Sequence, residues 1–87
     1  MMKLDYRELA PEGPALTEYD RKHVKLYMRL LDAEKDGASW QEAVKVLFGI
    51  CPNAEPDRAR RVHDSHLVRA HWMTEYGYRQ LRRGLPH

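Results

Sequence analysis

Apolar residues recur along much of this chain at steps of three and four, the spacing that gathers them on one face of an α-helix. In the first such run they are Tyr19, His23, Leu26 or Tyr27, Leu30 and Ala33. The pattern predicts a helix over residues 18–36. Thr17 is the predicted N-cap of this helix, and Asp20 at the third helical position makes the pair close to a capping box. Gly37 is expected to end the helix.

A second, shorter helix is predicted over residues 40–48. Ser39 and Glu42 form an S-x-x-E capping box at its start, and Gly49 is its C-terminal stop. The apolar side of this helix consists of Ala43, Val44, Leu47 and Phe48.

The third predicted helix is long, over residues 57–76. Pro56 has a fixed φ that suits a first helical turn, and Gly77 ends or kinks the helix before residues 78–83 add a further turn or two. The apolar face consists of Ala59, Val62, His66, Ala70 and Met73.

No segment has a convincing strand period, so the predicted fold class is all-α. We expect a short N-terminal arm over residues 1–16, because the cluster Pro11–Glu12–Gly13–Pro14 interrupts regular structure. Residues 17–87 are then expected to form one small helical bundle. A short capped helix, a Gly-led turn and a longer Arg-bearing helix follow each other in the order of a helix-turn-helix variant.

Composition limits the function classes. The chain has 87 residues, 32% of them charged, and a mean hydropathy of −0.77, which together indicate one soluble domain. No apolar run is long enough for a signal peptide or a membrane span, so we expect a cytoplasmic location. The single cysteine, Cys51, cannot form an internal disulfide.

Charge is distributed unevenly between the two parts of the chain. Residues 1–54 have a net charge of −1 and residues 55–87 have +3, and all cations of the second part are arginines. Guanidinium groups suit phosphate or carboxylate recognition. The surplus is nevertheless small for a nucleic-acid footprint, so charge alone leaves DNA binding open.

Several segments carry a family resemblance over residues 20–83. They are Leu30–Leu31–Asp32–Ala33, Gly37–Ala38–Ser39–Trp40–Gln41–Glu42–Ala43, Val46–Leu47–Phe48–Gly49 and Gly77–Tyr78–Arg79–Gln80–Leu81. Together they resemble the domain-of-unknown-function family 2285, whose members look like helix-turn-helix variants.

That resemblance implies two functional branches. Some members are DNA-binding regulators, such as the RovC type acting on type VI secretion and FseA-like activators of conjugative-element excision. Others are small, single-domain antiactivators of the QseM type, which bind transcriptional activators such as quorum-sensing regulators. The size and layout of this chain look most like QseM. The resemblance therefore implies an antiactivator that blocks activators controlling conjugative transfer of mobile elements.

The outward face of the third helix favours the same branch. It is predicted to show Asp64 and Glu75, which a polyanion would repel. An exposed Trp beside Arg is typical of a protein interface, so the predicted partner-binding residues are Arg61, Val68, Arg69 and Trp72. An alternative is that Trp72 covers the end of the N-terminal arm.

The competing hypothesis is direct DNA binding by a helix-turn-helix regulator. Its candidate contacts are the arginines of the second part of the chain: Arg58, Arg61, Arg69, Arg79, Arg82 and Arg83. The last three form the densest basic group, although cations also favour a helix C-terminus.

Catalysis, metal binding and a cofactor are not predicted. No nucleophile, base and oxyanion set is clustered in the sequence. His63 and His66 are three residues apart, but a zinc site needs three or four converging ligands. The sequence pattern gives no reason for Cys51 or His71 to join His63 and His66 as ligands. On the apolar face, His66 is expected to be a partly buried, hydrogen-bonded residue.

Overall fold

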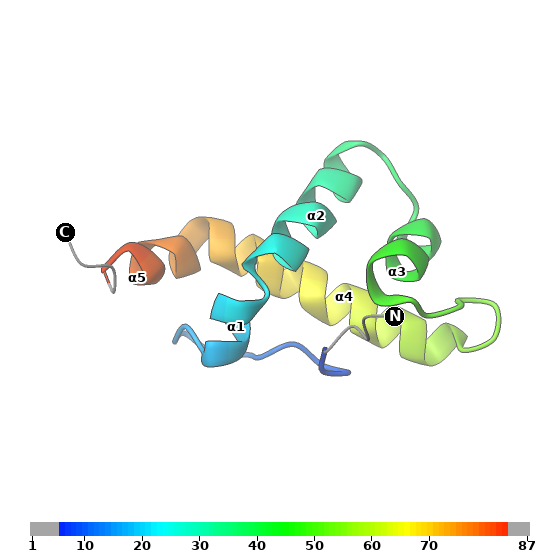
Figure 1. Cartoon of the computed structure of the whole chain (residues 1–87), viewed down its shortest axis with the longest axis horizontal. Coiled ribbons are helices and arrows are strands. Elements are labelled where there is room, and N and C mark those ends of the chain that lie inside the picture. Colours follow the sequence, from blue (N-terminus) through cyan, green and yellow to red (C-terminus); the bar gives the residue numbers. More distant parts are fainter. Residues whose placement is uncertain (1–5, 84–87) are drawn as a thin grey trace.

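A computed structural model describes the backbone of residues 6–83 and the side chains of residues 6–80 (Figure 1). The elements are α1 (Glu18–Lys22), α2 (Val24–Lys35), α3 (Trp40–Phe48), α4 (Pro56–Trp72), the π-helix η1 (Met73–Gly77) and α5 (Tyr78–Arg83). No strand occurs in the described part, which confirms the all-α fold class. None of its helices combines the length and apolar character needed to cross a membrane.

Helix α4 is the central helix of the bundle, contacted by both α2 and α3. In Figure 1, α4, η1 and α5 form one long rod, and α2 and α3 lie against one side of α4. Backbone residues of the arm contact the same helix, because the Ala10 amide donates to the Ser65 hydroxyl at 3.1 Å. The division into an arm over 1–16 and a domain over 17–87 stays a prediction.

Two apolar clusters make the core. One lies between α2, α3 and α4 and the other between α2, α4 and η1. They contain Leu30, Val44, Phe48, Ile50, Ala59 and Val62, and Tyr27, Ala70 and Met73, respectively. The predicted apolar face of the long helix is confirmed, since all five of its residues are fully buried.

The predicted helix over 18–36 is broken at His23. Its backbone leaves the helical region (φ −114°, ψ 21°), so α1 ends there and α2 begins. Its ring stacks on Tyr19 with the centroids 3.9 Å apart, and Nδ1 lies 2.8 Å from the Tyr19 carbonyl oxygen. The Tyr19 carbonyl also accepts the His23 amide at 3.1 Å, so this last turn of α1 is closed by backbone and side chain together.

The predicted single helix over 57–76 is instead α4 followed by the π turn η1. Gly77, expected to end or kink the helix, is buried within this turn. A Cβ placed there would overlap Met73 Sδ and lie 2.7 Å from Cζ3 of Trp72. The glycine is therefore required by a close side-chain approach, and the chain continues helically into α5.

Capping follows the sequence signals, except that the complete capping box is at α1 and not at α3. The Asp20 amide donates to Thr17 Oγ1, and the Thr17 amide donates to the Asp20 carboxylate. At α3, only the first half of the predicted box forms among the described residues, with the Glu42 amide donating to Ser39 Oγ at 3.2 Å. Gly49 ends α3 in the left-handed conformation at φ 70°.

Ser39→Ala should lower the free energy of unfolding by about 1 kcal/mol, since it removes the acceptor for one orphan amide of α3. Denaturant titration followed by circular dichroism measures this change. Ser39→Asp, which keeps an N-cap acceptor, is the matched control and should stay near wild type. Equal destabilisation by both variants would contradict a capping role.

Candidate nucleic-acid interface

Three arginines project from the first two turns of α4. Pro56 occupies the first turn of this helix, and Ala59 and Val62 are held in the core. The three positions beside these core residues reach the solvent. They are Arg58, Arg60 and Arg61, whose side chains are 40%, 54% and 49% exposed.

Each of these arginines has a carboxylate neighbour. Glu8 of the arm lies 3.4 Å from Nε of Arg58 and 3.4 Å from Nη2 of Arg61. Glu55 approaches Arg58 at 3.3 Å, and Asp64 pairs with Arg60. All of these carboxylates are about half-exposed, so the pairs are surface ion pairs, which typically contribute only about 0–1 kcal/mol.

Arg60 is absent from the contacts that the sequence predicts. Its Nε donates to Asp64 at 2.8 Å, and its guanidinium lies 4.7 Å from the centre of the Trp40 ring. Burial tends to raise the pKa of Asp64, but hydrogen bonds from His63 and Arg60 outweigh burial and lower it. Asp64 therefore keeps a negative charge on this face, as the sequence indicates.

The prediction that Arg69 lies on the outward face is wrong. The residue is only 3% exposed. Its guanidinium makes four hydrogen bonds of 3.0 Å or less: Nε and Nη2 donate to the two carboxylate oxygens of Asp20, Nη1 to the Gly13 carbonyl, and Nη2 to the Ala15 carbonyl. Arg69 thus ties the arm and α1 to α4 and is not available to DNA or to a protein partner.

The acidic half of this pair is not apparent from the sequence. Asp20 reads there as an N-terminal capping residue, yet it is fully buried. Burial opposes its ionisation, but hydrogen bonds from Arg69, Thr17 and Tyr27 hold its pKa below the usual value. The Tyr27 hydroxyl donates to Oδ1 at 2.8 Å. The only sequence signal for this buried pair is an acid at a capping position. It becomes informative only once its partner, Arg69, 49 residues away, is known.

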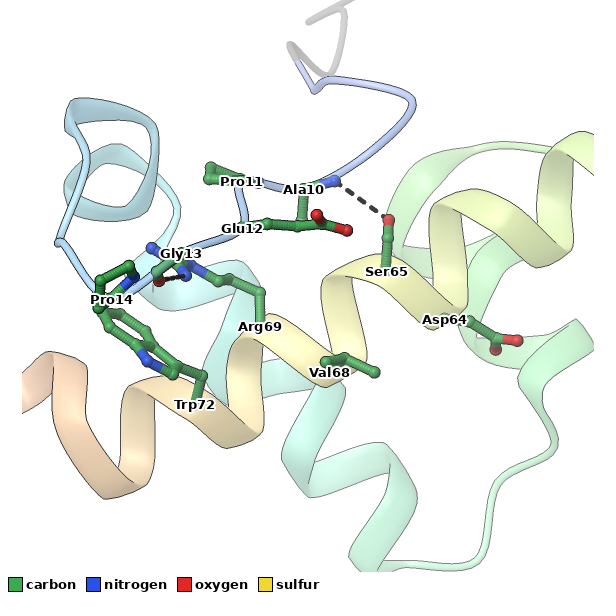
Figure 2. A pocket seen from close by; sticks show the side chains of 10 residues that line it. All are labelled: Ala10, Pro11, Glu12, Gly13, Pro14, Asp64, Ser65, Val68, Arg69 and Trp72. Atoms are coloured by element: carbon green, nitrogen blue, oxygen red, sulfur yellow. Dashed lines mark hydrogen bonds between the residues drawn. The ribbon is translucent and has the colours of Figure 1, made fainter.

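Trp72 is half-buried and covers this cluster, with the Arg69 guanidinium 3.8 Å from its ring centre. Figure 2 shows its ring beside the arm near Pro14, while Arg69 reaches toward the Gly13 carbonyl. A groove of about 650 Å³ lies between the arm and α4. The placement agrees with the alternative in which Trp72 covers the arm.

Of the four residues predicted for partner binding, Val68, Arg69 and Trp72 line the groove beside the arm, and Arg61 does not. Arg61 and Val68 are exposed, Arg69 is buried, and Trp72 packs against the arm. Of the predicted terminal arginines, Arg79 is exposed. The side chains of Arg82 and Arg83 lie outside the described part of the chain.

The histidines of the described part of the chain build no metal site. Within residues 6–83, no three His, Cys, Asp or Glu side chains converge in a way that could hold an ion. His66 is fully buried rather than partly buried, and both of its ring nitrogens face hydrogen-bond partners.

One family model matches nearly the whole chain. It is the RovC DNA-binding family, described as a T6SS transcription factor DNA-binding domain, and the match spans residues 1–83. No curated protein was found to be similar. The prediction of family 2285 with a QseM-type antiactivator is therefore wrong, because the matching family is defined by DNA binding. Quorum-sensing and conjugative-transfer partners lose their support with it.

Proposed function

Since the chain belongs to the family of T6SS transcription-factor DNA-binding domains, we propose that it binds duplex DNA and contacts it through the first turns of α4. The observation that carries this proposal is the family match, which covers residues 1–83. A regulator of this kind acts on DNA in the cytoplasm, in keeping with the composition. Its function requires no catalytic group or cofactor.

The arrangement of α3 and α4 supports a contact at this end of α4. A short helix, a loop and a longer helix follow the order of a helix-turn-helix, in which N-terminal residues of the later helix face base edges. Arg58, Arg60 and Arg61 occupy that position here. Arginine is suited to both guanine edges and phosphates because its guanidinium donates two parallel hydrogen bonds.

The carboxylate neighbours do not prevent such contacts. Exposed ion pairs are weak, whereas each phosphate contact releases condensed counterions and so gains free energy that depends on salt. A guanidinium paired with Glu8 or Glu55 can therefore exchange its partner for a phosphate. Breaking these ion pairs costs free energy and so reduces the affinity for DNA of the contacts made by Arg58 and Arg61.

Arg58→Ala combined with Arg61→Ala tests this site. In fluorescence anisotropy with a mixed-sequence duplex and with T6SS promoter fragments, the double variant should bind about ten-fold or more weakly. The slope of log K against log salt should become shallower by about 2. Lys35→Ala, at the C-terminal end of α2, is the matched control. Failure of the wild-type protein to bind any duplex at low salt would overturn the proposed function.

Glu8→Gln should strengthen DNA binding severalfold, because it leaves Arg58 and Arg61 without one competing carboxylate. The gain should be largest at low salt, where phosphate contacts contribute most. Glu42→Gln, on the exposed side of α3 and outside the ion pairs of the described residues, controls for the change in net charge. Equal gains from both variants would show that Glu8 acts only through net charge.

A further inference from the structure

Four cations stand on the exposed side of α1 and the first half of α2. They are Arg21, Lys22, Lys25 and Arg29. Within the described residues, none of the four takes part in an ion pair. We call this set the α1–α2 cationic surface. It differs in this respect from the start of α4, where every arginine has a carboxylate neighbour.

Folding takes one acid, Asp20, away from this surface. The sequence of α1 and α2 has four acidic residues, which nearly balance its cations. Asp20 is fully buried and paired with Arg69. Glu34 stays half-exposed near the C-terminal end of α2, where it lies 2.7 Å from Nε2 of His71 of α4. The other two acids of α1 and α2, Glu18 and Asp32, are exposed and take part in no ion pair among the described residues.

The pairing of Arg69 with Asp20 also lowers the exposed positive charge of α4. Burial of Arg69 removes one positive charge from the arginine-rich helix, while Glu8, Glu55 and Asp64 offset the three arginines at its start. The charge count of the sequence places the basic part after residue 54. Among the described residues, the cations of α1 and the first half of α2 are exposed and have no ion-pair partner, whereas each arginine at the start of α4 has a carboxylate neighbour.

We propose that the α1–α2 cationic surface is a second DNA-contacting site that binds backbone phosphates. This inference rests on the proposed function and adds to it a contact outside the α3–α4 pair. The ligand is the phosphate backbone and not the base edges, because contacts from exposed Lys and Arg are electrostatic and carry no sequence information by themselves.

At these four cations, no carboxylate of an ion pair among the described residues competes with a DNA phosphate. An unpaired lysine or arginine gains the full counterion-release term on meeting a phosphate, whereas Arg58 and Arg61 must first leave Glu8. Lys25 and Arg29 are four residues apart in α2, so they share one helix face. Both can therefore face one DNA strand.

The position of this surface is fixed relative to α4. The Asp20 carboxylate, in the middle of α1, accepts hydrogen bonds of 2.7 and 3.0 Å from Arg69 of α4. Tyr27 of α2 donates to the same carboxylate. The cations thus stand on helices tied to the α4 scaffold, so a contact there does not require ordering of a flexible tail.

Lys25→Gln combined with Arg29→Gln is the test. With a mixed-sequence duplex, we expect about a ten-fold or larger loss of affinity and a log K against log salt slope that is shallower by about 2. Lys35→Gln, also in α2 but at its C-terminal end, should change both quantities far less. Lys25 and Arg29 are both exposed, so the circular dichroism spectrum and melting temperature of the double variant should match those of the wild type. If the double variant folds poorly, the two single variants are measured in its place.

The two proposals fail in different ways. If the wild-type protein binds no duplex, both are overturned. If it binds, and Arg58→Ala with Arg61→Ala weakens binding while Lys25→Gln with Arg29→Gln behaves like Lys35→Gln, the second site is overturned and the α4 site stands. Roughly additive losses from the two double variants, each with its own decrease in salt slope, support two separate phosphate contacts.

Discussion

Arg69→Ala should remove a large share of the protein's stability. The substitution leaves the fully buried Asp20 carboxylate without its cation and frees the Gly13 and Ala15 carbonyls. Breaking a buried ion pair by removing one partner costs about 3–5 kcal/mol, whereas a native domain has a total stability of only about 5–15 kcal/mol. Loss of the Trp72 contact with the guanidinium adds to the cost.

Thermal and urea unfolding followed by circular dichroism measure this effect. Arg61→Ala is the matched control, because that side chain is half-exposed and its ion pair with Glu8 is long. Its free energy of unfolding should change by less than about 0.5 kcal/mol. A melting temperature for Arg69→Ala equal to that of Arg61→Ala would show that the buried pair does not hold the arm and α1 in place.

A double-mutant cycle isolates the pair itself. Asp20→Asn combined with Arg69→Leu removes both charges, and the amide oxygen introduced by the first substitution can still accept from the Tyr27 hydroxyl. The double variant should therefore be less destabilised than the sum of the two single variants, with a coupling of about 1–3 kcal/mol. Strict additivity would mean that the two charges do not interact.

The helical periodicity predicts most of the fold because local signals determine it. The α4 core positions repeat at the helical period, and Ser39, Gly49 and Pro56 mark ends that the structure keeps. The break at His23 and the π turn over Met73–Gly77 are not predicted. A particular side-chain approach accompanies each of them, of His23 to the Tyr19 carbonyl and of Trp72 to Gly77, and no periodicity reports such an approach.

The candidate site is less predictable because charge is redistributed by contacts distant in sequence. On a helical wheel, Arg69 lies near the edge between the buried and exposed faces of α4. Which side it joins depends on Asp20, 49 residues earlier. That one pairing hides a cation from the long helix and an anion from α1. A count of charges along the chain therefore does not report which charges stay exposed and unpaired after folding.

His66 shows how a residue on an apolar face is accommodated. It is fully buried and packs edge-on against Phe48, with ring centroids 4.9 Å apart. Nδ1 lies 2.7 Å from the Val62 carbonyl, which can only accept, so Nδ1 carries the proton. Nε2 then accepts from the Tyr19 hydroxyl at 2.7 Å, and that hydroxyl in turn accepts from the Arg7 amide.

This arrangement requires a neutral ring. Burial lowers the pKa of His66 from 6.5 to about 4, and the hydrogen bond to Val62 only partly opposes that effect. In the unfolded chain the ring takes up a proton near its ordinary pKa of about 6.5. Between these two values the unfolded state binds more protons than the folded state, so stability falls as pH falls.

The stability that depends on neutral His66 should be fully present above pH 6.5 and lost as pH falls toward about 4. One proton over this interval corresponds to a loss of about 3 kcal/mol. Urea unfolding at successive pH values measures it. His66→Gln, which can still donate to Val62 and accept from Tyr19, is the control and should show a flatter profile. A ring titration of His66 near pH 6.5 by NMR, or an equally steep profile in the glutamine variant, would contradict this account. The lowered pKa of Asp20 acts in the same direction, but its contribution is lost at lower pH because a carboxylate titrates below histidine.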